Sequence, residues 1–328
     1  MALIDVNNIF AVSPDSDHFC EQSLSVFRFQ YHQNRVYRQW CDLHEIEPNG
    51  VKTLKSIPSL PISFFKSHAV CSTEFIPENV FESSGTGQTG TSRHFVKDLS
   101  VYEQSFLDCF NKFYGNPQDW CILGLLPSYL ERQHSSLVMM VDALIKVSRH
   151  PQSGFYLDEH KKLSKNLSIL EKQEQKTLLI GVTFGLLDFA AEFPQKLKHT
   201  IVMETGGMKG RQKEITRKEV HKMLSEKLGV AKIHSEYGMT ELLSQAYSAG
   251  DGRFICPPWM KVMIREVDDP LQISNSGTGL LTIIDLANIY SCSFIATDDV
   301  GNVYEDGSFE VLGRLDNSDL RGCSLMVV

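Results

Sequence analysis

The sequence Ser83-Ser84-Gly85-Thr86-Gly87-Gln88-Thr89-Gly90-Thr91-Ser92 combines small side chains with many backbone N–H groups. A segment of this kind can wrap around phosphate oxygens. It contains the GxGxxG pattern of dinucleotide-binding loops, and Gly85 and Gly90 also have the spacing of a Walker P-loop. The residues around the segment must decide between these loops.

Neither loop fits its surroundings. A dinucleotide loop follows a buried apolar strand, whereas residues 77–84 are too polar for a central strand. A Walker loop needs a lysine directly after its last glycine, but position 91 is a threonine and the nearest cations are Arg93 and Lys97. A Ser/Thr/Gly linker without any ligand stays open as a further interpretation.

Length and composition indicate a globular protein of one large or two modest domains. The chain has 328 residues, of which 42% are hydrophobic and 22% charged, as is usual for soluble proteins. The net charge of −8 argues against nonspecific nucleic-acid binding. The N-terminus does not match a secretory signal, and no apolar run is long enough to span a bilayer. We expect a cytoplasmic protein that is not integral to a membrane and has no nucleic-acid partner.

Eight cysteines are scattered along the chain without any CxxC pair. A structural zinc site needs clustered ligands, so this spacing does not indicate bound metal. Most of the thiols are expected to be reduced and buried. Cys323, close to the C-terminus, is the exception by position.

Apolar runs alternate with helical patterns through the middle of the chain, which predicts an α/β fold with mainly parallel strands. After residue 259 the runs become short and alternating, which predicts a smaller antiparallel region near the C-terminus. The first part of the chain favours a helix over residues 19–40. The predicted strands are 120–126, 177–184, 199–204, 262–267, 279–285, 293–296 and 309–312, with a helix to 147 and another over 216–228.

Three further segments carry chemical groups suited to a nucleotide. Residues 234–241 end in Tyr-Gly-Met-Thr-Glu, which offers a ring for a base, a hydroxyl for a phosphate and a carboxylate for Mg²⁺. Thr297-Asp298-Asp299 is predicted as a turn between apolar strands whose carboxylates can hold a ribose diol. Gly313-Arg314-Leu315-Asp316 follows the strand at 309–312. Each segment alone also fits an ordinary turn or strand end.

In this order the four segments resemble the motifs of the adenylate-forming superfamily, which includes acyl-CoA ligases, adenylation domains and luciferase-like enzymes. The most similar group is the LuxE-type acyl-protein synthetases, and the likeness runs from about residue 81 to the C-terminus. It implies the large-domain fold of that superfamily, with an adenylation domain over 1–315 and a short flexible tail over 316–328, and without the mobile C-terminal domain. Supporting stretches are residues 126–130, 204–211, 236–242 and 321–325.

The resemblance also implies a role for each matching residue in binding ATP and Mg²⁺. In the loop after residue 236, Tyr237 stacks on the base beside Gly238 and Met239, Thr240 meets the α-phosphate and Glu241 binds Mg²⁺. The residues implied for the phosphates are Ser83, Ser84, Gly85, Thr86, Thr89 and Gly90; those near adenine are Gly206 and Gly207; those near ribose are Asp299 and Arg314.

Two departures leave the register of these loops open by one or two positions. The usual phosphate loop closes with Pro-Lys, whereas this chain has Gly87-Gln88 inserted and Arg93 nearby. The ribose turn has Asp298 where the family has glycine.

The function implied is that of an ATP-dependent acyl-protein synthetase. Such an enzyme converts a carboxylic acid, here a fatty acid, into acyl-AMP and passes the acyl group to a cysteine thiol. Cys323 matches the acceptor and Arg321 can lower its pKa, so the catalytic candidates are Cys323, Thr240 and Arg314. An acyl reductase or an acyl carrier is the implied partner.

Two alternatives remain open. One is a related ligase that transfers the acyl group to coenzyme A or to a carrier-protein thiol. The other is a noncatalytic subunit that binds a nucleotide or an acyl group. Among the remaining residues, His94, His134 and His234 are interpreted as core or surface histidines, and the helical spacing of Leu186 and Phe189 favours core over an acid pocket.

Overall fold

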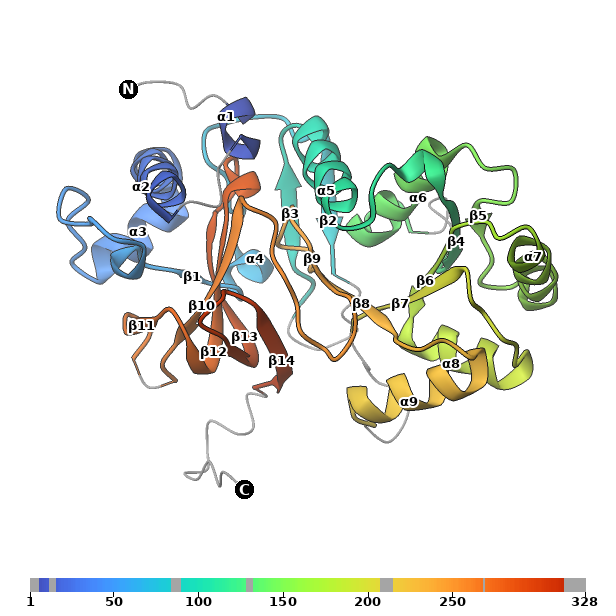
Figure 1. The fold of residues 1–328 in the computed structure, drawn as a ribbon. Coiled ribbons are helices and arrows are strands. Elements are labelled where there is room, and N and C mark those ends of the chain that lie inside the picture. Colours follow the sequence, from blue (N-terminus) through green and yellow to red (C-terminus); the bar gives the residue numbers. More distant parts are fainter. Residues whose placement is uncertain are drawn as a thin grey trace. The chain divides into compact units, whose positions relative to one another are not determined.

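The computed structural model describes residues 6–11, 16–83, 90–127, 132–206, 215–267 and 269–315. The chain divides into two compact units (Figure 1). Unit 1 combines Met1–Thr73 with Pro258–Val328, and unit 2 is Glu74–Pro257. Within the described ranges, no helix is long and apolar enough to cross a membrane.

Unit 2 contains a sheet with the strand order β5-β4-β6-β7-β8-β9. Its first five strands are parallel, and β9 runs antiparallel to β8. The predicted α/β fold with parallel strands is therefore confirmed. The strands are β4 (Cys121–Leu125), β5 (Gly154–Phe155), β6 (Thr177–Val182), β7 (Thr200–Thr205), β8 (His234–Tyr237) and β9 (Ala246–Ser248).

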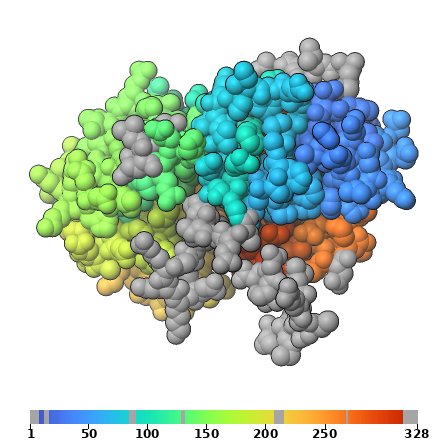
Figure 2. Space-filling view, turned by 180° about the vertical axis from the view of Figure 1, so that it is seen from behind, coloured from blue at the N-terminus to red at the C-terminus, as the bar shows by residue number. Residues whose placement is uncertain are grey.

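Helices connect these strands, and a separate two-stranded hairpin precedes them. The hairpin strands β2 (Asn79–Glu82) and β3 (Arg93–Val96) flank the glycine-rich segment. Viewed from behind, the cyan and green parts of unit 2 lie side by side (Figure 2). The helices are α5 (Leu99–Tyr114), η2 (Pro117–Asp119), α6 (Ser136–Ser148), α7 (His160–Lys172), α8 (Thr183–Glu192) and α9 (Arg217–Leu228).

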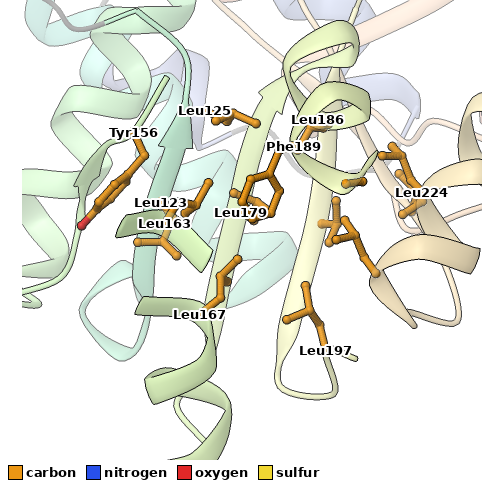
Figure 3. Packing of buried hydrophobic residues seen from close by; sticks show 14 of the residues in the cluster. Leu123, Leu125, Tyr156, Leu163, Leu167, Leu179, Leu186, Phe189, Leu197 and Leu224 are labelled. Carbon is orange, nitrogen blue, oxygen red and sulfur yellow. The ribbon is translucent and has the colours of Figure 1, made fainter. Parts of the chain in front are cut away.

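The inner strands β4 and β6 are almost entirely apolar because both faces of the sheet are covered there. Leu123 and Leu125 of β4 lie in one buried cluster with side chains of α7, α8 and α9 (Figure 3). Between them, Gly124 faces the other side, where an added Cβ would lie 3.2 Å from Val141 of α6. Successive residues of a strand face opposite sides, so neighbouring positions of these two strands both favour apolar residues.

Leu186 and Phe189 of α8 belong to the same cluster and are fully buried. Their interpretation as core residues is therefore confirmed. Burying a leucine side chain stabilises a fold by roughly 1.5–3 kcal/mol. The predicted strand at 177–184 was too long, because α8 begins at Thr183, whose hydroxyl donates to Glu204 at 3.2 Å.

Unit 1 contains a sheet with the order β1-β13-β12-β10-β11, in which β14 pairs with β13. Apart from β1, which is parallel to β13, its pairings are antiparallel. The predicted antiparallel region is confirmed. The strands are β1 (Leu60–Pro61), β10 (Met260–Arg265), β11 (Ile273–Ser274), β12 (Gly277–Asp285), β13 (Phe294–Val303) and β14 (Phe309–Arg314). The helices are α1 (Val6–Phe10), α2 (Ser16–Gln33), α3 (Arg35–Leu43), η1 (Leu54–Ser56), α4 (Phe64–Ser67) and η3 (Leu286–Asn288).

The single helix predicted for residues 19–40 is broken at Asn34. The Asn34 side chain accepts a hydrogen bond from the N–H of Tyr37 and so caps α3. Its amide also donates to the carbonyl of Ser291 at 2.8 Å. A bond to a residue so distant in sequence cannot be seen from helical periodicity, which explains the error.

The predicted turn at Thr297-Asp298-Asp299 is also wrong, because these residues lie inside β13. Ala296 and Val300 pair with Thr282 and Leu280, so the three residues face a single residue, Leu281, on β12. This is a bulge. The Thr297 hydroxyl bridges the gap by donating to the carbonyl of Leu281 at 2.7 Å.

Candidate functional site

The candidate site in unit 2 lies where two parallel strands end. Thr205, the last residue of β7, is paired with Glu236 of β8. Gly206 follows β7 directly, and residues 238–241 follow β8. Since the carboxyl ends of parallel strands share one edge, the fold brings Gly206 and this loop together.

The loop at the end of β8 carries an aromatic, a hydroxyl and a carboxylate side chain, which differ in their exposure to solvent. Tyr237 is 9% exposed, and its ring packs against Phe254 with centroids 5.8 Å apart. Met239 and Thr240 are half-buried and Glu241 is buried. A hydrogen bond from the Leu242 N–H to the Met239 carbonyl closes a turn. The loop thus presents Thr240 between an aromatic pair and a buried carboxylate.

The glycines that follow β7 and β8 differ in the space around them. Gly206 has a φ of +22°, and an added Cβ would meet no atom within 4 Å. At Gly238, in contrast, a Cβ would collide with Oε1 of Glu236. Gly207 lies outside the described residues.

The hairpin positions two of the predicted phosphate-binding residues at its base. Ser83 donates its N–H to the Ser92 carbonyl, and its hydroxyl oxygen accepts from the Ser92 N–H at 3.0 Å. The Ser83 side chain therefore closes the base of the loop. Gly90 adopts a φ of +84°. The other predicted members, Ser84, Gly85, Thr86 and Thr89, lie outside the described residues.

A buried histidine links this hairpin to the loop after β8. His94 of β3 is 1% exposed, and its Nδ1 lies 3.0 Å from the carbonyl oxygen of Thr240. Because a carbonyl only accepts, Nδ1 must donate. Burial lowers the pKa of His94 to about 4, although the bond to Thr240 acts in the opposite direction. The core interpretation of His94 fits this burial; His134 is exposed.

Arg217 and His221 lie close to Glu204, a residue for which sequence analysis predicted no role. Its Oε1 lies 3.6 Å from Nε of Arg217 and 3.6 Å from Nε2 of His221. Burial alone would raise the pKa of Glu204, but the interactions with His221, Ser235 and Arg217 outweigh it and lower the pKa. The spacing of Arg217 and His221, one turn apart on a helix, is the signal available in the sequence.

Glu236 is the second carboxyl group that sequence reasoning missed. Burial, and then the charge of Glu204, raise the pKa of Glu236 to about 8. Glu204 pairs with Ser235, and Glu236 with Thr205, so the two carboxyl groups lie on opposite faces of the sheet. One buried carboxyl group is thus held ionised and its neighbour neutral at pH 7.

Unit 1 brings its two predicted residues together. Asp299 and Arg314 are paired across β13 and β14, and Nε of Arg314 donates to Oδ1 of Asp299 at 2.8 Å. Asp299 is 5% exposed, whereas the Arg314 side chain is 46% exposed. The bulge in β13 and a second register shift between Val300 and Gly301 frame this ion pair.

No group of three His, Cys, Asp or Glu side chains that could hold a metal occurs in the ranges that the structure describes. Mg²⁺ usually binds through one or two carboxylates together with substrate phosphates. A single buried carboxylate such as Glu241 fits that donor set. Cys323 lies outside the described residues.

A hollow of about 240 Å³ lies at the other end of the unit 2 sheet. Ile201 and His234, near the starts of β7 and β8, line it together with Tyr114, Trp120 and Tyr247. Because these residues are at the amino ends of the strands, the hollow is separate from the candidate site.

Known proteins resemble this chain over most of its length. The sequence profile of the family "Acyl-protein synthetase, LuxE" matches residues 6–106 and 143–328. A long-chain-fatty-acid–luciferin-component ligase from Aliivibrio fischeri is 25% identical over 97% of this chain and 91% of its own length. The ligase of the same name from Vibrio harveyi is 23% identical over 91% and 84%.

Among solved structures, ATP-bound MatB from Rhodopseudomonas palustris matches with a TM-score of 0.55 and 16% identity, over 72% of this chain and 47% of that one. A long-chain-fatty-acid-CoA ligase from Archaeoglobus fulgidus matches with a TM-score of 0.50 and 14% identity, over 72% and 51%. The chain spans about half the length of these structures. The likeness shows the fold that adenylate-forming enzymes share.

Proposed function

Because the chain belongs to the LuxE family of acyl-protein synthetases, we propose that it activates a long-chain fatty acid with ATP and transfers the acyl group to a protein thiol. The observation that carries this proposal is the shared edge of β7 and β8, where Gly206 meets the loop with Thr240 and Glu241. The names of the two curated relatives support a long-chain fatty acid as substrate.

We assign the nucleotide contacts of unit 2 by the chemistry of each group. The open space at Gly206 and the ring of Tyr237 suit adenine, and the Thr240 hydroxyl suits the α-phosphate. Glu241 supplies one carboxylate to Mg²⁺, whose other ligands are phosphate oxygens and water. The backbone of the segment with Ser83 and Gly90 suits the β- and γ-phosphates.

In unit 1, the carboxylate of Asp299 suits the two hydroxyls of a ribose. Arg314 holds that carboxylate at 2.8 Å and so fixes its orientation. The half-exposed guanidinium also carries a positive charge that suits phosphate or ribose oxygens.

Magnesium-bound ATP supplies an electrophilic phosphorus and a leaving pyrophosphate. The fatty-acid carboxylate attacks the α-phosphorus, pyrophosphate departs, and acyl-AMP forms. A thiolate then bonds to the acyl carbon, the bond from that carbon to AMP breaks, and a thioester results. The protein contributes by holding the two anions close and by neutralising their charge.

We propose Cys323 as the thiol that receives the acyl group, from which a partner such as an acyl reductase can collect it. Several of the described cysteines are held in the thiol form. Burial raises the pKa of Cys41 to about 12 and that of Cys71 and Cys121 to about 11. A thiol with so high a pKa is almost never ionised at pH 7.

Incubation of the protein with ATP, Mg²⁺ and fatty acids of several chain lengths tests both steps. Pyrophosphate release that requires ATP and the acid supports activation, and a mass increase by one acyl group supports transfer. Cys323→Ser should keep pyrophosphate release and lose the mass increase. The matched control is Cys20→Ser, at a partly exposed cysteine, which should keep both.

Other results would support the alternatives. Acylation that persists in Cys323→Ser would assign the acceptor role to another residue. Acyl-CoA without labelled protein would indicate a ligase that uses coenzyme A. ATP binding without pyrophosphate release would indicate a noncatalytic subunit.

A further inference from the structure

The hydrogen bond between His94 and Thr240 joins two segments that are 146 residues apart in sequence. His94 lies on β3 opposite Phe81 of β2, within the hairpin that flanks the glycine-rich segment. Thr240 lies in the loop that follows β8. Both belong to unit 2. The bond therefore fixes one candidate nucleotide-binding segment against the other.

Other contacts hold the loop at its far end. The hydroxyls of Ser244 and Ser105 are 3.1 Å apart, and the Cys109 thiol donates to the carbonyl of Gln245 at 3.4 Å. Ser105 and Cys109 lie on α5, so this helix anchors residues 244 and 245. His94 holds Thr240, which lies four residues before Ser244. This contact is therefore between the end of β8 at Tyr237 and the residues that α5 anchors.

We propose that His94 is a positioning residue that sets the location of Thr240 and Glu241 relative to the hairpin. Its imidazole is rigid and almost completely buried, so it fixes the Thr240 carbonyl more tightly than a solvent-exposed side chain would. A neutral ring also adds no charge beside groups that are to bind anions and a cation. The link to catalysis rests on the proposed function, whereas the link between the segments does not.

Variants of His94 can be chosen that either keep or lose the hydrogen bond to Thr240. Asparagine can place an N–H close to the position of Nδ1, so His94→Asn should keep the bond to Thr240. Glutamine extends one bond further, and leucine has no donor, so His94→Gln and His94→Leu should lose it. His134 is the matched control, because its Nδ1 bonds to the carbonyl of Val80 at 3.0 Å without contacting the loop.

Hydrogen exchange of the protein without nucleotide tests the structural link. We expect faster exchange at residues 238–243 in His94→Leu and His94→Gln, and near-native exchange there in His94→Asn and His134→Leu. Exchange in β6 and β7 should remain unchanged. Equal protection of residues 238–243 in all four variants would overturn the proposal, as would equal loss in His94→Asn and His94→Gln.

Kinetics of acid-dependent pyrophosphate release test the consequence. Loss of an orienting contact of this kind typically lowers activity about 10- to 100-fold. We expect this loss in kcat for His94→Gln and His94→Leu, a smaller change in KM for ATP, and recovery of most of the activity in His94→Asn. Native kcat in His94→Gln would overturn the positioning role.

The two proposals can fail separately. If the native protein releases no pyrophosphate, the proposed function fails, and hydrogen exchange still decides whether His94 positions the loop. If His94→Leu does not fold, the comparison of His94→Asn with His94→Gln decides the same question.

Discussion

Glu236 is a buried side chain whose proton matters for stability. Its side chain is 7% exposed. Burial and the neighbouring Glu204 favour its neutral form and raise its pKa to about 8 from an ordinary 4.5. Burying a charged carboxylate close to another one is costly, so the folded protein favours the protonated form of Glu236.

This proton makes the free energy of unfolding depend on pH. Between the unfolded pKa of 4.5 and the folded pKa of about 8, the folded chain binds more protons at Glu236 than the unfolded chain does. Stability therefore falls as the pH rises through this window. Glu236→Gln removes the titration, and its stability relative to the native protein should rise by up to about 1.4 kcal/mol per pH unit.

Urea unfolding at about pH 5 and about pH 8 measures this effect. Glu82→Gln, at an exposed glutamate of β2, is the control and should follow the native pH dependence. Parallel curves for Glu236→Gln and the native protein would contradict a neutral Glu236.

At the level of elements, α9 orients the side chains that surround Glu204. Thr216 caps this helix: its hydroxyl oxygen accepts from the Glu219 N–H at 3.3 Å, while the Glu219 carboxylate accepts from the Thr216 N–H at 2.7 Å. Arg217 and His221, the residues that face Glu204, lie in the first two turns. The cap therefore holds both side chains in place.

Loss of this capping box should be measurable. We expect Thr216→Ala to lower the free energy of unfolding by about 0.5–2 kcal/mol, as measured by urea denaturation. Thr216→Ser keeps the hydroxyl and is the control. A Thr216→Ala protein as stable as Thr216→Ser would show that the cap contributes nothing.

The elements of unit 2 could be predicted because their signals are local. The apolar runs of β4, β6 and β7 and the cap at Thr216 depend on neighbouring residues in the sequence. The break at Asn34 and the bulge at 297–299 could not be predicted, because they depend on partners on other elements, Ser291 and Leu281.

The same distinction applies to the candidate site. Motif residues such as Tyr237 and Glu241 stand out in the sequence because their spacing is short. His94, Glu204 and Glu236 gain their properties from neighbours on other strands and helices. No pattern within their own segments indicates a bond to Thr240 or a pKa near 8.

On the scale of the whole molecule, one unit is formed by a single continuous segment of the chain and the other by two separate segments. Unit 2 is one uninterrupted segment with its own core. Unit 1 joins both ends of the chain: the amide of Gln30 donates to the carbonyls of Asn288 and Ile289, both at 3.0 Å. Residues 1–73 thus depend on residues beyond 258 for buried hydrogen bonds.

We therefore expect a fragment of residues 74–257 to fold without the rest of the chain. It should give a cooperative urea transition and the circular dichroism of an α/β protein. A fragment of residues 1–73 is the control and should not unfold cooperatively, because Gln30 and Asn34 lack their partners. A gradual, non-cooperative transition of the 74–257 fragment would contradict this expectation.

The split of unit 1 also affects how the protein forms during translation. When the ribosome has released α2, the partners of Gln30 and Asn34 have not yet been synthesised. Elongation through unit 2, roughly 180 residues, takes about 10–40 s at typical rates of about 5–20 residues per second. During that time Phe27 of α2 can pack against Tyr37 of α3 but not yet against Phe294 of β13. The nascent N-terminal helices therefore leave part of their apolar surface uncovered until the last strands of unit 1 have been synthesised.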